Sequence, residues 1–211
     1  MRILISDSIG EVSAEINESK NMKAVLVLAH GAGAGMNHRF MVQLSGELMQ
    51  KGIGTIRYNF PYMENGKKRP DVPAVATKTV EMVLRRAYEL FPTVPIFASG
   101  KSFGGRMSSQ CLSKNSIDYV KGIIFYGFPL HPAGAPAVDR AEHLKQVKVP
   151  MLFLQGTRDA LAELSLIQKV CSELDNASLI LFEGADHSFK SGKKEFISEL
   201  VIATEKWLAG L

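Results

Sequence analysis

The sequence predicts an α/β protein in which a mostly parallel sheet carries helices on both faces. Short apolar runs recur along the chain, segments with apolar residues at helical spacing lie between them, and glycine-containing turns follow several runs. Strands joined by helical crossovers pair in parallel, and each crossover helix must cover a face of the sheet. With 211 residues, 46% of them hydrophobic, the chain suits one domain over residues 1–211.

The first third of the chain predicts a short strand pair followed by two buried strands. Residues 3–6 and 12–16 flank a short turn, which indicates an opening pair. Residues 24–29 are apolar without a break, as in a strand buried on both faces of a parallel sheet. A helix is expected over about residues 37–52, closed by a glycine, and residues 54–60 form the next strand.

The middle third continues the alternation. Residues 61–73 are rich in proline, glycine and charge, so we expect a long loop at the border of a pocket. Apolar residues at helical spacing predict a helix over residues 75–90. A strand at residues 95–99, a helix at residues 103–112 and a buried strand at residues 120–126 follow.

The last third predicts two further strand and helix pairs. Residues 130–149 are expected to be irregular, because prolines interrupt them and no period is visible. Strands are expected at residues 150–155 and 178–182, with an amphipathic helix at residues 164–174 between them. A helix over residues 196–207 closes the chain.

A Gly-x-Ser-x-Gly turn follows the strand at residues 95–99. Gly100, Ser102 and Gly104 form the motif, and residues able to open a helix come next. A serine at so sharp a turn adopts strained backbone angles, and the flanking glycines remove Cβ atoms that would collide. The pattern predicts a nucleophile elbow, which exposes the Ser102 hydroxyl at the end of the sheet.

Two segments match part of a nucleotide-binding motif, but each lacks a glycine that the motif requires. Residues 100–102 end as a phosphate-binding P-loop does, but Pro95 stands where that motif needs its first glycine. Residues 31–33 resemble the start of a dinucleotide-binding fingerprint, but Met36 takes the place of the third glycine. We therefore favour the elbow.

An acid and a histidine follow later strands. Asp159 and His187 each stand just past an expected strand and come after Ser102 in the chain order found with this turn. Because serine is a weak nucleophile at neutral pH, a histidine must take its proton, and an acid must orient the imidazole. These three are the predicted catalytic residues. Asp159 also suits the N-cap of the following helix, and Asp186 and Asp139 are rival acids.

Acyl transfer also needs donors for the oxyanion, and backbone N–H groups can supply them. Phe103, the residue after the serine, offers one such group. The second is expected from the loop after residues 24–29, at Ala32 or Gly33. Candidate pocket residues are His38, Tyr62 and Lys101.

Over nearly its whole length the chain resembles the α/β-hydrolase superfamily, in its small lidless branch near the dienelactone-hydrolase-like proteins. Residues 31–38, 59–62 and 100–106 are also similar to a little-characterised subfamily that includes a testis-expressed protein and a subunit of a histone-acetyltransferase complex. The resemblance implies an α/β-hydrolase fold without a lid domain. It further implies a carboxylesterase or dienelactone-hydrolase-like enzyme that cleaves a small ester with no metal or cofactor. The alternative is a non-catalytic interaction protein that retains the fold.

Lys101 departs from the common esterase pattern, in which histidine, tyrosine or an acid precedes the serine. Arg39 and Arg106 are expected near it. Two interpretations stay open: these cations favour a substrate that bears a carboxylate, or they form salt bridges that pack the elbow.

Charge and composition argue against several classes of function. The chain has 25 basic and 21 acidic residues, a mild excess, and its basic clusters at residues 67–69 and 190–194 lie in segments typical of solvated loops. No nucleic-acid partner is expected, and the sequence does not indicate a protein partner. No apolar run is long enough to span a membrane and the N-terminus is unlike a signal peptide, so we expect a cytoplasmic protein without membrane contact.

The remaining histidines and the cysteines predict structural roles. His30 closes a strand and is expected to hold the following loop by a hydrogen bond, whereas His131 and His143 are expected to face solvent. No histidine has the spacing of a zinc ligand, so no metal is expected. Cys111 and Cys171 have apolar neighbours in helical segments, which predicts core packing and no disulfide.

Overall fold

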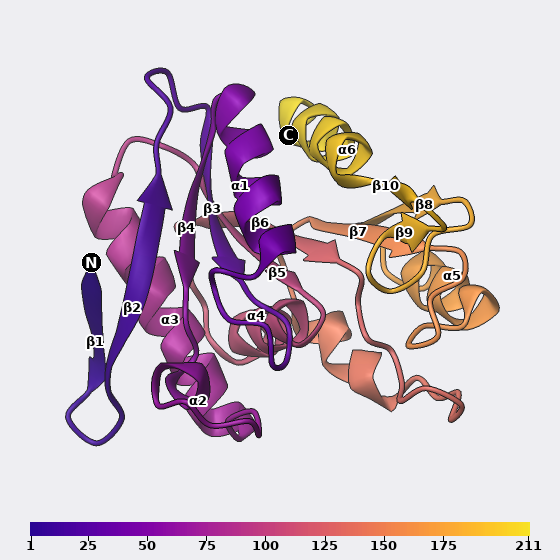
Figure 1. Ribbon diagram of the computed structural model, residues 1–211, viewed down its shortest axis with the longest axis horizontal. Coiled ribbons are helices and arrows are strands. Elements are labelled where there is room, and N and C mark those ends of the chain that lie inside the picture. The colour runs from indigo at the N-terminus through magenta and orange to yellow at the C-terminus, as the bar shows by residue number, and fades with distance from the viewer.

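A mostly parallel sheet of eight strands runs through the computed structural model, which describes residues 1–211 (Figure 1). The strand order is β1-β2-β4-β3-β5-β6-β7-β8, and only the β1–β2 and β2–β4 pairs are antiparallel. The strands are β1 (Arg2–Ser6), β2 (Gly10–Asn17), β3 (Ala24–Ala29), β4 (Ile53–Tyr58), β5 (Ile96–Lys101), β6 (Val120–Tyr126), β7 (Met151–Gly156) and β8 (Ala177–Phe182). The predicted α/β class with its parallel sheet is confirmed.

Helices cover both faces of this sheet, as the sequence predicts. They are α1 (Arg39–Gln50), α2 (Pro61–Glu64), α3 (Pro73–Leu90), α4 (Phe103–Lys114), the 3₁₀ helix η1 (Asp139–Gln146), α5 (Leu164–Ser172) and α6 (Ile197–Ala209). Side chains of α1 and α6 pack in one core, and those of α3, α4 and α5 pack in another on the opposite face. None of the helices is both long and apolar enough to cross a membrane.

The unbroken apolar run of β3 supplies both cores. Val25 and Val27 belong to the core under α3 and α4, and Leu26 and Leu28 belong to the core under α1 and α6. Successive side chains of a strand point to opposite faces of the sheet. A strand between two cores therefore needs an apolar residue at every position.

Three short elements differ from the expected loops. The expected loop at residues 61–73 begins with α2, whose first turn Pro61 favours because its fixed φ suits a helix start. The expected irregular segment at residues 130–149 contains η1. The basic segment at residues 190–194 forms an antiparallel hairpin of β9 (Lys190–Ser191) and β10 (Lys194–Glu195). Elements this short do not span enough residues to show a period in the sequence.

The prediction that His131 and His143 face solvent is wrong. His131 is 3% exposed, and its Nε2 accepts the Glu163 N–H at 2.8 Å while its Nδ1 donates to the Pro132 carbonyl at 2.8 Å. His143 is half-buried and lies 2.8 Å from the hydroxyl of Ser109 on α4. Both imidazoles connect chain segments that the sequence does not pair.

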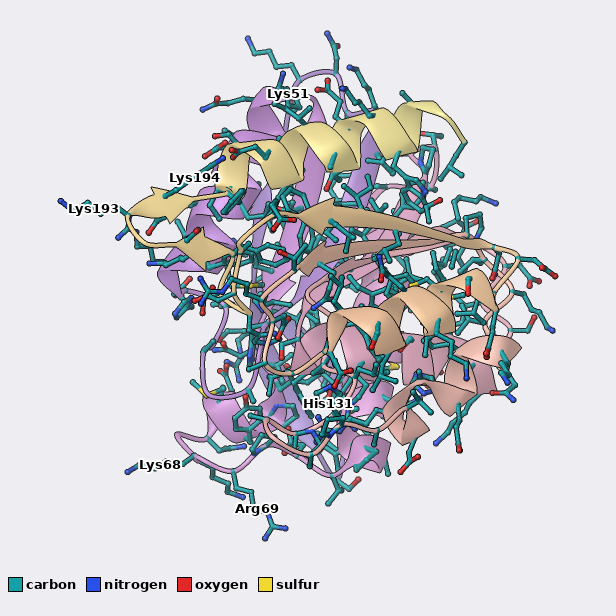
Figure 2. All side chains as sticks on the ribbon, turned by 90° about the vertical axis from the view of Figure 1, so that its right-hand side faces the viewer. Lys51, Lys68, Arg69, His131, Lys193 and Lys194 are labelled. Atoms are coloured by element: carbon teal, nitrogen blue, oxygen red, sulfur yellow. The ribbon has the colours of Figure 1, made fainter.

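The basic clusters lie apart on the surface, as Figure 2 shows for four of the lysine and arginine side chains. Lys68 and Arg69 project from the loop after α2, whereas Lys193 and Lys194 belong to the hairpin of β9 and β10. All four side chains are exposed, and Lys194 pairs with Glu199 at 2.9 Å. These two clusters do not form one continuous stripe.

The turn between β5 and α4 has the geometry that its motif predicts. Ser102 has φ 51° and ψ −116°, a backbone conformation that residues other than glycine rarely adopt. A Cβ on Gly104 would lie 2.5 Å from the Ala29 carbonyl oxygen and 2.6 Å from that of His30. Only glycine therefore allows α4 to begin so close to the end of β3.

This contact gives a stability prediction. We expect Gly104→Ala to lower the free energy of unfolding by about 1–3 kcal/mol, because its methyl group meets backbone that cannot move aside. Gly46→Ala is the matched control, since Gly46 lies within α1 and no atom stands within 4 Å of its added Cβ. Alanine should stabilise α1 there by about 1 kcal/mol. Thermal denaturation measures both variants, and equal melting temperatures would contradict the packing argument.

Candidate active site

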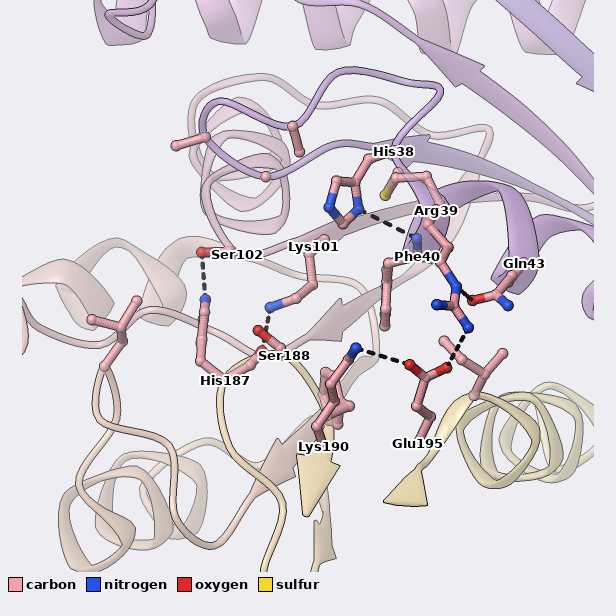
Figure 3. A pocket seen from close by; sticks show the side chains of 17 residues that line it. His38, Arg39, Phe40, Gln43, Lys101, Ser102, His187, Ser188, Lys190 and Glu195 are labelled. Carbon is pink, nitrogen blue, oxygen red and sulfur yellow. Dashed lines mark hydrogen bonds and ion pairs between the residues drawn. The ribbon is translucent and has the colours of Figure 1, made fainter. Parts of the chain in front are cut away.

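The structure brings Ser102, His187 and Asp159 together beyond the carboxyl ends of three strands. Ser102 follows β5, Asp159 follows β7 and His187 follows β8. The Ser102 Oγ lies 2.8 Å from His187 Nε2 (Figure 3), and His187 Nδ1 lies 2.7 Å from Asp159 Oδ2. The three side chains therefore form one hydrogen-bonded series from hydroxyl to imidazole to carboxylate.

The loops after β7 and β8 are bonded to each other, which aligns the acid with the histidine. The Arg158 N–H donates to the Ala185 carbonyl at 2.9 Å, and the Gly184 N–H donates to the Thr157 hydroxyl at 2.8 Å. Gly156 permits this contact, because a Cβ there would meet the carbonyl oxygen of Ala185. Steric space thus explains why a glycine ends β7.

Asp159 is a buried acceptor with three donors. It is 5% exposed, and its Oδ1 accepts the Leu161 N–H at 2.8 Å while its Oδ2 accepts from His187 and from the Gln155 side chain. The N-cap interpretation of Asp159 is wrong, because α5 begins at Leu164 and Glu163 is its N-cap. The Leu161 bond instead closes the turn that presents the carboxylate to the imidazole.

Gln155 is a member of the site that sequence reasoning missed. It is fully buried at the end of β7, donates through Nε2 to Asp159 and accepts the Phe128 N–H at 2.9 Å. The sequence signal that could have identified it is a polar residue near the end of an otherwise apolar strand. The buried amide therefore helps to fix the carboxylate of Asp159.

The rival acids lie elsewhere. Asp186 uses its Oδ1 to accept the N–H groups of Ser188 and Lys190, at 2.8 and 2.9 Å, and so braces its own loop. Asp139 begins η1 and makes no hydrogen bond to His187. Asp159 is the carboxylate in contact with the imidazole.

The surroundings of His187 favour its neutral form. Burial lowers the pKa of His187 below its usual value, and the cation of Lys101 lowers it further. The hydrogen bond to Asp159 and the charges of Asp159 and Asp186 act in the opposite direction without cancelling the shift. A neutral imidazole is able to accept a proton from Ser102 near neutral pH.

The loop after β3 corrects two expectations. The Gly33 N–H donates to the Tyr62 hydroxyl at 2.9 Å, so it is not free to bind an oxyanion. Tyr62 is only 1% exposed and supports this loop from below, so it does not line the pocket as expected. His30 also holds the loop, as the sequence predicts, because its Nδ1 donates to the Gly31 carbonyl at 2.7 Å and its Nε2 accepts the Phe60 N–H at 3.1 Å. Burial lowers the pKa of His30 to about 4.

Two backbone N–H groups near Ser102 have no partner within the protein. Ala32 is exposed in the pocket, and its N–H donates to no other group. Phe103 is the first residue of α4, where a helical N–H has no intrahelical acceptor. Of the backbone donors expected from the sequence, Ala32 and Phe103 are thus available.

A pocket of about 490 Å³ opens over Ser102 and His187 (Figure 3). His38 and Lys101 line it, as expected, and the His38 Nδ1 also accepts the Phe40 N–H at 3.3 Å at the start of α1. The carboxylate of Glu195 is shared between Arg39 at 3.3 Å and Lys190 at 2.8 Å. The larger apolar side chains that line the pocket are Phe40, Met41, Leu161, Phe189 and Ile197.

Lys101 does not form a salt bridge. Its Nζ donates to the carbonyl of His187 at 2.7 Å and lies over the rings of Phe189 and Phe40, with centroids 5.5 and 6.0 Å away. Arg39 lines the same pocket, but Arg106 does not. The salt-bridge interpretation of Lys101 is therefore wrong.

Comparisons with known proteins identify the family and the fold. The sequence pattern of the family described as "Alpha/beta hydrolase domain" matches residues 22–205. Dienelactone hydrolase from Anabaena variabilis is 14% identical, with a TM-score of 0.81 over 100% of this chain and 95% of its own. Est1E from Butyrivibrio proteoclasticus with ferulic acid bound is 17% identical, with a TM-score of 0.79 over 100% and 98%. A serine hydrolase without a lid from Xanthomonas campestris is 16% identical, with a TM-score of 0.72 over 100% and 91%.

Proposed function

We propose that this chain, which belongs to the α/β-hydrolase family, is a serine hydrolase that cleaves a small carboxylic ester through an acyl-enzyme intermediate. The hydrogen-bonded series from Ser102 through His187 to Asp159, with distances of 2.8 and 2.7 Å, is the observation that carries the proposal. The first distance lies within the reach that proton transfer from Ser102 to His187 requires, and the second lets Asp159 orient the imidazole. The free space over Ser102 gives a substrate access to its hydroxyl.

The first half of the reaction forms an ester on Ser102. As the Ser102 Oγ attacks the carbonyl carbon of the substrate, His187 Nε2 accepts the hydroxyl proton and the carbonyl oxygen becomes an oxyanion. The tetrahedral intermediate then expels the alcohol oxygen, which takes the proton back from Nε2. Asp159 accepts the hydrogen bond of Nδ1–H throughout and stabilises the imidazolium.

The second half returns the enzyme to its starting state. A water molecule gives a proton to His187 Nε2 as its oxygen attacks the acyl carbon, and a second oxyanion forms. Its collapse releases the carboxylic acid and returns the proton to Ser102. Every proton and charge in this cycle is handled by side chains and backbone of the chain, so the cycle requires no cofactor.

The oxyanion would be stabilised by the N–H groups of Ala32 and Phe103. Each donor of this kind is worth about 3 kcal/mol of barrier in serine hydrolases. Gly33 instead serves the site through its bond to Tyr62, which fixes the path of the loop that carries Ala32. The donors are then in position before the substrate arrives.

The size and lining of the pocket favour a small or medium-sized acyl group. A volume of about 490 Å³ is within the range of small-molecule sites. Phe40, Leu161 and Ile197 give it an apolar wall, while Ser102 and His187 stand at its floor. Among the structural relatives, one contains bound ferulic acid and another is a dienelactone hydrolase. Ferulic acid and a dienelactone are both small molecules of a size that suits this pocket.

Labelling with a fluorophosphonate probe tests the proposal. The wild type should be labelled and Ser102→Ala should not, because the probe reacts only with an activated serine. Ser113→Ala is the matched control on the same helix, where the hydroxyl bonds to the Gln110 carbonyl away from the pocket. Labelling that persists in Ser102→Ala would reject Ser102 as the nucleophile. A wild type with neither labelling nor esterase activity would favour the non-catalytic interaction protein.

A further inference from the structure

Lys101 connects the two parts of the site that carry the nucleophile and the base. It is the last residue of β5, next to Ser102, and its Nζ donates to the backbone carbonyl of His187 at 2.7 Å (Figure 3). The two residues lie 86 positions apart in the sequence. One side chain thus spans from the elbow to the histidine loop.

No other protein group serves the carbonyl of His187. Neither a backbone N–H nor any other side chain donates to it, so loss of the ammonium would leave this carbonyl without a protein partner. The loop is also under backbone strain, because Phe189 adopts φ 57° two residues later. A strained loop needs such external contacts to keep one conformation.

The backbone around Lys101 leaves a fitted channel for its side chain. A Cβ on Gly31 would lie 3.6 Å from Lys101 Cγ, and a Cβ on Gly127 would lie 3.2 Å from Lys101 Nζ and 3.6 Å from His187 Cε1. Gly127 has φ 75°, which favours glycine on its own account. The ammonium is therefore enclosed beside the imidazole by the backbone at Gly127 and by the rings of Phe40 and Phe189.

The charges around this ammonium belong to several elements. The carboxylates of Asp159 and Asp186 act on it at longer range, but burial has the larger effect and lowers the pKa of Lys101 to about 8. The other titratable or charged residues that line the pocket are His38, Arg39, His187, Lys190 and Glu195. Since Glu195 is shared by Arg39 and Lys190, no carboxylate neutralises Lys101 directly.

We propose that Lys101 is a positioning residue, which holds His187 against Ser102 through the His187 carbonyl and places a fixed positive charge beside the imidazole. The inference rests on the proposed function, because it assigns a role within that reaction. A fixed cation beside an imidazole makes protonation less favourable, so the base is available at lower pH. The hydrogen bond keeps Nε2 within reach of the hydroxyl.

The effect of Lys101 on the protonation of His187 predicts how kcat/KM depends on pH. Only neutral His187 accepts the serine proton, so kcat/KM falls as the pH drops through the pKa of His187. Lys101 lowers that pKa. Removal of the cation should therefore raise it, and the acid limb of the pH profile should move to higher pH.

The experiment measures kcat and kcat/KM against pH for wild type, Lys101→Met and Lys101→Arg. The two substrates are a neutral p-nitrophenyl ester and a matched ester with a carboxylate on its acyl chain. Methionine keeps the stem and removes both charge and donor, so kcat should fall on the order of 10²-fold, as for a misplaced catalytic group. The fall should be equal for both esters, and the acid limb should move to higher pH. Lys101→Arg retains a cation and should keep the acid limb of the wild type.

Lys193→Met is the control for loss of one exposed positive charge outside the pocket, and it should match the wild type. An unmoved acid limb in Lys101→Met would overturn the inference. So would a loss confined to the anionic ester, because that result would make Lys101 a substrate-binding residue. If Lys101→Met does not fold, Lys101→Gln, which also removes the charge, provides the test of the acid limb. A wild type without fluorophosphonate labelling would instead reject the proposed function itself.

Discussion

Replacement of Ser102 or of His187 by alanine is expected to lower kcat for ester hydrolysis on the order of 10⁶-fold, and replacement of both is expected to cost no more than either alone. The two side chains are joined at 2.8 Å and carry out one step, the transfer of the serine proton during attack. Without the hydroxyl there is no nucleophile, and without the imidazole the hydroxyl keeps its proton. The effects of groups that act as a unit are therefore not additive.

Release of p-nitrophenol from a neutral ester measures this prediction in the two single variants and the double variant. His143→Ala is the matched control for loss of an imidazole, because His143 bonds to Ser109 and does not line the pocket. Circular dichroism before kinetics ensures that folded proteins are compared. Losses that multiply in the double variant would show that Ser102 and His187 act in separate steps, contrary to the proposed mechanism.

The sheet was predictable because each of its parallel strands carries its own signal. β3 lies between two cores, so every position must be apolar, and such a run stands out in the sequence without knowledge of its partners. Ser102, Asp159 and His187 could be selected for a related reason. Parallel strands end at the same edge of the sheet, so residues just past separate strands are brought together by topology alone.

The missed features depend on contacts between distant segments. The Tyr62 hydroxyl accepts the Gly33 N–H, which is then not available to an oxyanion, and the two residues are 29 positions apart in the sequence. The imidazole of His131 accepts the N–H of Glu163, which is 32 positions away. Nothing in the local sequence of either residue marks its partner. Lys101 is the clearest case, since its unusual place before the serine was visible but its acceptor, the carbonyl of His187, was not. A backbone acceptor has no side-chain identity that a sequence pattern could record.

In the resulting site the oxyanion donors are fixed by the fold, and the general base His187 is held by side-chain contacts. Gly104 lets α4 begin against the end of β3, which fixes the Phe103 N–H, and Tyr62 fixes the loop that carries Ala32. His187, in contrast, lies in a strained loop between β8 and β9 and depends on Lys101 and Asp159 for its position. Variants of these two partners should therefore affect catalysis more than folding.

Asp159→Asn should lower kcat on the order of 10⁴-fold while the protein stays folded. Three donors point at the carboxylate, from His187, Gln155 and Leu161, and an amide has only one oxygen to offer them. When the amide nitrogen faces His187, Nδ1 must become an acceptor and the imidazole proton moves to Nε2. That tautomer cannot accept the proton of Ser102.

The matched control is Asp186→Asn, which changes the neighbouring acid in the same way. Asp186 accepts two backbone N–H groups through a single oxygen, and an asparagine can keep both bonds. Its loss of kcat should be much smaller than that of Asp159→Asn, and thermal denaturation should show both variants folded. A larger loss in Asp186→Asn would transfer the role of the acid to Asp186. Because the two carboxylates differ in which atoms they face rather than in charge, this pair of variants separates orientation of the imidazole from simple electrostatic attraction.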